Sequence, residues 1–423
     1  MERIKSIWLL LSTDAVLCCN ESSQPSNIVS DLMSLELFTK IISLAKEKSW
    51  ACTVLGNENE IPGAYRKFCQ ETNVTVILPA NYKGSIPGKH TVIVFEPSQT
   101  ESAAKYSSVS QAILRIRRDD LPKLSQMVLA LLDRFTDISI KHPELLSYND
   151  EDMITYKNQL LEISMELLGK KESWCNYRVD CLTDRFQSDD IVECGAGVAK
   201  IAVGPTGELY LCPAAARNAE SPCGHILGDV EIPNRHLLTR EYSVLCDKCD
   251  ALHCRRCVYL NRCSTFEFCV PSRNMCRLAH FELEIQAWLA QEAIKKNLWD
   301  ESSNIPASPA IYDPYELVKA EKSPPIAHSW RRLVTFEGHP ENLQPSMMLD
   351  IIHHLQGWYD ALTTCAQAGL APAVQLMESD KLASLRRRTI EQYRDVIFQE
   401  GCPTVRQIEL LMCKAVQENS SPS

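Results

Sequence analysis

The stretch Cys246–Arg262 reads CDKCDALHCRRCVYLNR and contains two Cys-x-x-Cys pairs that four residues separate. A further cysteine, Cys276, follows the second pair after 18 residues. Two thiolates separated by two residues can reach one metal from a single tight turn, so both zinc sites and iron–sulfur sites use such pairs. This stretch therefore predicts a metal-binding segment, with further ligands supplied by other parts of the chain.

A predicted β-hairpin lies upstream, between Cys194 and Cys212. Its turn is residues 204–207, GPTG, because proline favours the second position of a turn and glycine the fourth, and short apolar runs flank it as strands. On an extended strand, Cys194 would lie about 16 Å beyond the residue opposite Cys212. If both cysteines bind one centre, the chain must curl back after Cys194, and Gly195 and Gly197 permit such a curl.

The chain contains 19 cysteines, and twelve of them lie within the 102 residues from Cys175 to Cys276. Two complete four-ligand sites would need eight ligands, and the two elements above supply seven. The eighth ligand is expected among the other cysteines of the segment or from a non-cysteine donor; the candidates are Cys175, Cys181, Cys223, Cys263, Cys269 and His225. In or beside this segment lie His225, His253 and His280, and we expect each of them to be a structural, hydrogen-bonding residue rather than a ligand.

Iron–sulfur clusters, a zinc site, and free or disulfide-linked thiols are the alternatives for these cysteines. Structural zinc sites usually place a longer stretch between their two pairs than the four residues found here, which favours iron–sulfur clusters over zinc. The N-terminal apolar run, residues 7–11, is too short for a signal-peptide core, and no stretch approaches the roughly 20 apolar residues of a membrane helix. The sequence thus predicts a cytoplasmic protein without a membrane partner, and reduced thiols in that compartment favour metal binding.

Residues 1–169 are predicted to form an α/β domain, because short apolar strands alternate with helical patterns. Strands are expected at residues 4–11, 52–55, 74–78, 91–95, 113–116 and 138–140, and helices near residues 35–45, 62–70, 121–134 and 152–168. This alternation indicates a mostly parallel sheet with helical crossovers, either open or closed into a partial barrel. Neither a P-loop nor a GxGxxG motif occurs, and the net charge of −10 gives no basic footprint for nucleic acid.

The predicted organisation has four parts. The α/β domain spans residues 1–169, the Cys-rich domain residues 170–290, a helix end with a Pro-rich linker residues 291–327, and a helical C-terminal extension residues 328–423. Five prolines between residues 306 and 325 mark the linker.

The order of the cysteines is similar to that of the SPASM domain, which ends many radical-SAM peptide maturases and carries two auxiliary [4Fe–4S] clusters. The usual middle spacings of that domain are 2, 5 and 3, whereas this chain has 2, 4 and 2. With GPTGELYLCPA at residues 204–214 before it, the stretch Cys246–Arg262 resembles the CXXX repeat peptide maturases of bacterial gene clusters.

The resemblance implies two ligand sets. The first cluster would be bound by Cys194, Cys212 and Cys257, with an additional ligand from Cys175, Cys181 or Cys223. The second would be bound by Cys246, Cys249, Cys254 and Cys276. The resemblance also implies that residues 1–169 form a degenerate, partial radical-SAM-like barrel.

The CxxxCxxC motif that holds the SAM-binding cluster of radical-SAM enzymes is absent from the sequence. Cys18 and Cys19 follow the first predicted strand, where that motif would lie, but two adjacent cysteines cannot replace three at that spacing. The Gly-Gly-Glu stretch that binds the amino group of SAM is also absent. The sequence therefore assigns no SAM-binding residue and no catalytic residue.

Three functions fit these observations. The first is maturation of a ribosomally synthesised Cys-repeat peptide by an iron–sulfur, radical-SAM-like enzyme. The second is a non-catalytic, cluster-bearing accessory that binds the precursor peptide or passes electrons to a partner maturation enzyme or reductase. The third is a zinc-stapled interaction module. The sequence leaves open whether the protein is itself an enzyme.

Overall fold

The structure, a computed structural model, describes residues 4–21, 32–72, 74–86, 90–170, 176–183, 186, 194–217, 222–228, 232, 235–240, 246, 249–265, 271–299 and 308–310. The predicted C-terminal helices, most of the predicted linker, Cys175 and Cys269 lie outside these ranges. The chain divides into two compact units. Unit 1 comprises residues 1–239, 250–259 and 274–312, and unit 2 comprises residues 240–249, 260–273 and 313–423. Within the described ranges, no helix is long and apolar enough to cross a bilayer.

The described part of unit 1 contains a nine-stranded sheet with the strand order β7-β6-β5-β4-β3-β2-β1-β8-β9. Its strands are β1 (Ser6–Leu10), β2 (Ala51–Leu55), β3 (Thr75–Pro79), β4 (Thr91–Phe95), β5 (Gln111–Arg115), β6 (Asp137–Lys141), β7 (Arg178–Val179), β8 (Lys200–Val203) and β9 (Leu209–Tyr210). Neighbouring strands run parallel, except that β9 is antiparallel to β8. The predicted α/β class with a mostly parallel sheet is confirmed.

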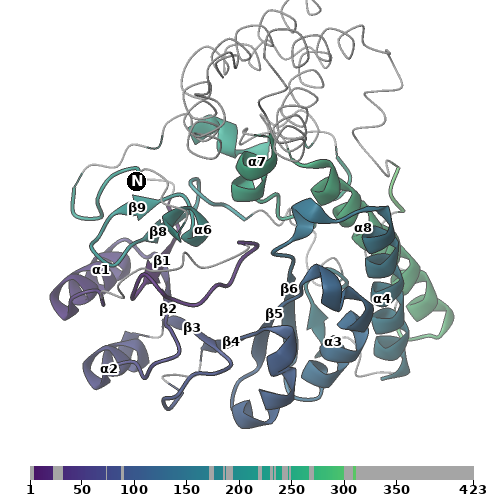
Figure 1. The fold of residues 1–423 in the computed structure, drawn as a ribbon, viewed down its shortest axis with the longest axis horizontal. Coiled ribbons are helices and arrows are strands. Elements are labelled where there is room, and N and C mark those ends of the chain that lie inside the picture. The colour runs from purple at the N-terminus through teal and green to yellow at the C-terminus, as the bar shows by residue number, and fades with distance from the viewer. Residues whose placement is uncertain are drawn as a thin grey trace, which may run out of the picture. The chain divides into compact units, whose positions relative to one another are not determined.

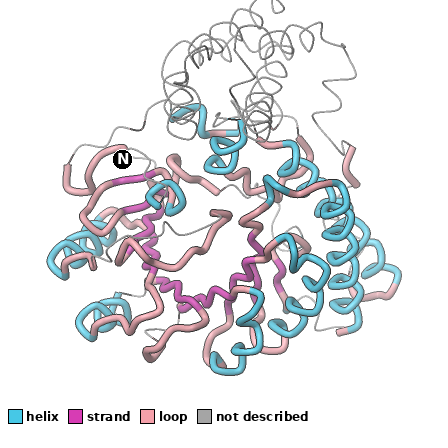
Figure 2. Tube along the Cα trace, viewed as in Figure 1, coloured by secondary structure: helices cyan, strands magenta, loops and turns pink. Residues whose placement is uncertain are grey.

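Helices connect the strands, and the sheet follows a curve with α1, α2, α3 and α4 on its outer side (Figures 1 and 2). The α-helices are α1 (Leu35–Glu47), α2 (Gly63–Thr72), α3 (Leu124–Leu132), α4 (Asp150–Gly169), α6 (Pro213–Arg217), α7 (Val258–Thr265) and α8 (Arg273–Lys295). The 3-10 helices are η1 (Pro97–Tyr106), η2 (Arg118–Lys123), η3 (Leu145–Ser147) and η5 (Arg235–Leu238). Polar side chains set the helix starts: Ser34 accepts a hydrogen bond from the Leu37 N–H, and Asn149 accepts one from the Asp152 N–H.

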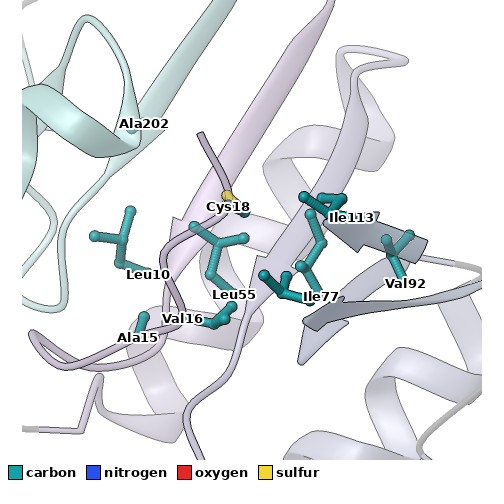
Figure 3. Close-up of a cluster of buried hydrophobic side chains, with 10 residues drawn as sticks. Leu10, Ala15, Val16, Cys18, Leu55, Ile77, Val92, Ile113 and Ala202 are labelled. Carbon is teal, nitrogen blue, oxygen red and sulfur yellow. The ribbon is translucent and has the colours of Figure 1, made fainter. Parts of the chain in front are cut away.

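The inner face of the curved sheet is packed with apolar side chains (Figure 3). The strands contribute Leu10, Leu55, Ile77, Val92, Val94, Ile113 and Ala202. The loop after β1 contributes Ala15, Val16 and Cys18, which are buried in the same cluster. Removing apolar surface from water is the main stabilising term in folding, so this loop belongs to the core rather than to the surface.

The sheet continues beyond residue 169, because β7, β8 and β9 come from the Cys-rich part of the sequence. Strand β8 pairs with β1 from Ser6↔Lys200 to Leu9↔Val203. The hairpin of β8 and β9, which precedes Cys212, is therefore fixed to the N-terminal strand of the chain.

The predicted curl of the chain after Cys194 is confirmed. The Lys200 N–H donates to the Gly195 carbonyl at 2.8 Å, and the Gly197 N–H donates to the Lys200 carbonyl at 2.7 Å. Gly195 and Gly197 have φ angles of 72° and 73°, in the left-handed region that favours glycine. These two residues return the chain so that Cys194 lies at the start of the hairpin instead of on an extension of β8.

We expect Gly197→Ala to weaken this curl. A Cβ at position 197 would lie 2.5 Å from Leu238 Cδ1 and 2.9 Å from Leu211 Cδ2, and the positive φ adds backbone strain. Together these effects should destabilise the fold by about 1–3 kcal/mol, measurable by chemical denaturation followed by circular dichroism. The matched control is Gly169→Ala in α4, where a Cβ meets no atom within 4 Å. Equal stability of the two variants would contradict the role given to Gly197.

Candidate functional site

Charged side chains mark the carboxyl edge of the sheet, where strands β4 to β7 end. Arg115 at the end of β5 donates to Glu96, which follows β4, at 2.5 Å. Lys141 at the end of β6 donates to Asp180, which follows β7, at 2.9 Å. In open parallel sheets the carboxyl ends of the strands are where binding sites form, so this edge is the candidate site.

The loop after β1 lies across the inner side of this edge. The Val16 N–H donates to the Gly56 carbonyl at 2.7 Å, which ties the loop to the end of β2. The Asn20 side chain accepts from the His142 N–H at 2.8 Å, which ties the loop to the end of β6. Residues 15–21 therefore span the concave face, and Ala15, Val16 and Cys18 pack in the apolar cluster there (Figure 3).

A buried ion pair fixes this loop. Arg217, at the end of α6, donates to Glu21 Oε1 at 2.5 Å and to the Val16 carbonyl at 2.6 Å, and both charged side chains are almost fully buried. Arg115 adds a hydrogen bond to the Glu21 carbonyl at 2.5 Å. A buried charge without a partner is very costly, so this network holds the loop in one position.

The thiols of Cys18 and Cys19 lie side by side on the loop, with their sulfur atoms 4.0 Å apart. Cys18 is buried, as expected for a small apolar side chain. The contact with Cys18, burial, and the proximity of Glu21 and Cys194 raise the pKa of the Cys19 thiol well above its ordinary value. Both sulfurs therefore belong to the packed loop, and the Cys19 thiol is protonated near neutral pH.

The structure brings Cys194 beside the second Cys-x-x-Cys pair. The Cys194 N–H donates to the Arg255 carbonyl at 3.0 Å, and Arg255 lies between Cys254 and Cys257 in the chain. The Arg255 side chain in turn lies 3.5 Å from Asp180. Cys194 and the loop between Cys254 and Cys257 therefore lie at the carboxyl edge of the sheet.

Asp180 stays ionised in this position. Burial alone would raise the pKa of its carboxyl group, but the positive charges of Lys141 and Arg255 and a hydrogen bond from the Ile140 N–H lower that pKa well below its usual value. The carboxylate can therefore hold both the strand end and the Cys-rich loop at neutral pH.

The other predicted ligands of unit 1 lie in distinct surroundings. Cys212 Sγ accepts a hydrogen bond from the Ala215 N–H at 3.4 Å, an environment that suits a thiolate. The Cys223 thiol donates to the Leu209 carbonyl at 3.3 Å, and burial raises its pKa. Cys181 is buried beside Tyr156.

In unit 2, the first Cys-x-x-Cys pair forms the expected tight turn. The Cys249 N–H donates to the Cys246 carbonyl at 3.2 Å. The Arg240 side chain donates to the same carbonyl at 2.7 Å and also to the Cys249 carbonyl. Cys263 is partly buried on α7.

Two carboxylate–histidine pairs join the loop before Cys254 to α8, the helix that carries Cys276. Asp250 lies 3.0 Å from His280 Nε2, and His253 Nε2 lies 3.0 Å from Glu282 Oε2. All four residues belong to unit 1. The loop and the helix that supply Cys254 and Cys276 are therefore held by charge-assisted hydrogen bonds.

Sequence reasoning missed the residues that hold the site together. Glu21, Arg115, Arg217 and Glu282 each lack a motif, and their partners lie far away in the chain: Glu21 and Arg217 are separated by 196 positions. The available signal was a lone charge that ends an apolar run, as in QAILR at residues 111–115 and PAAAR at residues 213–217.

We expect Arg217→Met to destabilise unit 1 by about 3–5 kcal/mol, because it leaves the Glu21 carboxylate buried without its partner. Adding Glu21→Gln to that variant should restore part of the loss, since no buried charge then remains in the pair. Chemical denaturation of the three proteins measures both effects. Lys40→Met, which breaks the exposed pair with Glu36 on α1, is the control and should leave stability unchanged.

His142 should make the fold sensitive to acid. Burial, with a contribution from Lys141, lowers the pKa of its imidazole from 6.5 to about 3, so the folded protein holds it neutral while the unfolded chain protonates it below pH 6.5. Stability should therefore fall between pH 6.5 and pH 3, by about 1.4 kcal/mol per pH unit.

The His142→Phe variant should lose this slope while keeping the ring contact with Tyr156. Urea denaturation at pH 7 and pH 5 compares it with the wild type and with His90→Phe, which changes an exposed histidine. A slope that survives in His142→Phe would show that another group causes it.

The sequence matches no protein-family model and no curated protein. Among solved structures, the chain is similar to Streptococcus suis SuiB bound to precursor peptide SuiA, with a TM-score of 0.37, 10% identity, and coverage of 54% of this chain and 64% of that chain. It is also similar to SuiB bound to S-adenosylmethionine, with a TM-score of 0.38, 10% identity, and coverage of 56% and 65%. The matched region spans less than two thirds of the neighbour's length in both cases.

Proposed function

We propose that the protein is an iron–sulfur protein that takes part in the maturation of a ribosomally synthesised Cys-repeat peptide. The observation that carries this proposal is the hydrogen bond between the Cys194 N–H and the Arg255 carbonyl. It joins the cysteine of the hairpin curl to the segment of Cys254 and Cys257, which supports a cluster shared by Cys194 and Cys257. In this proposal the seven cysteines of that order hold two [4Fe–4S] clusters.

The residues of the first set suit thiolate ligation. Cys194 and Cys257 belong to segments that contact one another, and Cys212 Sγ already accepts a backbone N–H, as cluster-bound sulfurs do. The S–H of Cys223 is engaged by a carbonyl oxygen, which is a poor neighbour for a negatively charged sulfur. A bound cluster would supply one-electron chemistry or an iron that holds a group of the peptide.

The residues of the concave face do not fit SAM. Ala15, Val16 and Cys18 occupy the inner side of the sheet, and the Glu21–Arg217 pair fixes them there. Together with the missing three-cysteine motif, this packing favours the accessory role over catalysis by the chain itself. We therefore propose that the protein binds the precursor peptide, or passes electrons between a reductase and a partner maturation enzyme.

The metal content of the anaerobically purified full-length chain tests the clusters. We expect a brown protein with about eight irons and eight sulfides per chain, as two four-iron clusters require. Cys257→Ser should lose about half of the iron, while Cys69→Ser should lose none, because burial raises the pKa of the Cys69 thiol to about 12 and this thiol lies in α2. A colourless protein with stoichiometric zinc would overturn the proposal.

Peptide binding separates the two roles. The reconstituted protein is mixed with a synthetic Cys-repeat peptide, SAM and a strong reductant, and peptide binding, peptide mass and SAM cleavage are followed. Peptide binding without SAM cleavage supports the accessory role. A change in peptide mass accompanied by SAM cleavage would establish the enzyme role instead, and the absence of binding and of any product would remove both.

A further inference from the structure

Three histidines lie in or beside the Cys-rich part of unit 1, and two of them use both ring nitrogens. His225 Nδ1 accepts from the Leu227 N–H at 3.2 Å, and its Nε2 lies 3.1 Å from the Thr206 carbonyl. His280 Nδ1 lies 2.8 Å from the Cys276 carbonyl, and its Nε2 lies 3.0 Å from Asp250. In these contacts each ring nitrogen of His225 and His280 already has a polar partner.

His253 differs from both. Its Nε2 lies 3.0 Å from Glu282 Oε2, whereas its Nδ1 is buried and has no hydrogen-bond partner among the residues that the structure describes. The whole residue is 3% exposed. Buried polar atoms almost always have a partner, and an orphan of this kind needs an explanation.

The surroundings of Glu282 determine which nitrogen of His253 carries the proton. The Tyr156 hydroxyl donates to Glu282 Oε1 at 2.8 Å. Glu282 Oε2 then accepts the Nε2–H of His253. The lone pair of Nδ1 is left unused in the interior.

A carboxylate that receives one N–H of an imidazole, while the other nitrogen carries a free lone pair, is the arrangement of metal-bound histidines. The carboxylate fixes the ring and makes the free nitrogen a better donor. Position 253 precedes Cys254 directly and lies four residues before Cys257, within the segment that Cys194 contacts. Imidazole is a normal ligand for iron, including iron in iron–sulfur clusters.

We propose that Nδ1 of His253 is a metal ligand. Two four-iron clusters need eight ligands, the cysteine pattern supplies seven, and His253 would be the eighth. The inference rests on the proposed function, because the metal is an iron of a cluster held by this segment. It replaces the expectation that His253 is only structural. Glu282 and Tyr156 are positioning residues that act through the imidazole.

A neutral nitrogen in place of a negatively charged thiolate makes the net charge of the cluster less negative. Histidine ligation raises the reduction potential of iron–sulfur centres for this reason. The centre bound by His253 should therefore accept an electron more readily than the cluster whose ligands are all cysteines. This difference in reduction potential would favour electron transfer from the all-cysteine cluster to the centre bound by His253.

Pulsed EPR of the reduced full-length protein, labelled with ¹⁵N-histidine, tests the ligand directly. We expect a hyperfine coupling from a coordinated nitrogen in the wild type and in His225→Ala, the control from the same segment. His253→Cys should keep its iron, lose the coupling and show a lower reduction potential. Glu282→Gln should keep the fold and weaken metal binding by about tenfold.

The outcomes separate this inference from the proposed function. An iron-loaded wild type without nitrogen coupling, or a coupling that persists in His253→Cys, overturns the inference and leaves the clusters in place. A protein that binds only zinc overturns the proposed clusters. In that case X-ray absorption tests whether His253 binds the zinc. Zinc–nitrogen scattering that disappears in His253→Cys supports His253 as a ligand, and scattering that persists in this variant rejects it.

Discussion

The ion pair between Glu21 and Arg217 is the constraint on which the arrangement of the site depends. Both side chains are almost completely buried, at 0% and 1% exposure, and each would be strongly destabilising without the other. The pair joins the loop after β1 to α6, the helix that follows the hairpin. Because Arg217 and Arg115 also hold carbonyl groups of the loop, the loop has one position, and that position is inside the curve of the sheet.

A second group of charges connects the sheet to the Cys-rich loop. Asp180 receives Lys141 from β6 and Arg255 from the segment between Cys254 and Cys257. The Asp180 carboxylate is buried and has lost its hydration, and the positive charges of Lys141 and Arg255 offset that loss. Removing either side chain would leave the buried negative charge incompletely paired. The position of the proposed cluster segment is thus set by the same strand ends that define the candidate site.

Periodicity predicts much of this fold. Apolar runs such as TVIVF at residues 91–95 are buried on both sides, as parallel strands require, and the helices between them follow from their spacing. The glycines after Cys194 also predict the curl correctly, because positive φ angles have few other sequence signals. These features depend on neighbours in the chain, which is why the sequence is sufficient.

The apolar cluster on the concave face and the proposed role of His253 depend on contacts that no local sequence pattern predicts. The alternation of predicted strands and helices does not show what occupies the inner side of a curved sheet. The loop Ala15–Cys18 has no motif that marks it as part of the core. His253 contacts Glu282, which lies 29 residues away, and Glu282 accepts from Tyr156, which is 126 residues from Glu282. Such pairs become visible once the helices α4 and α8 are placed together.

The strand order also constrains how the chain acquires its structure. β1 lies in the interior of the sheet, between β2 and β8, although β8 comes much later in the chain. Its second edge stays open until residues 200–203 have been made, so an unpaired parallel strand is exposed until then. Exposed edges invite pairing with other chains, so this edge of β1 is open to wrong pairing until β8 has been made.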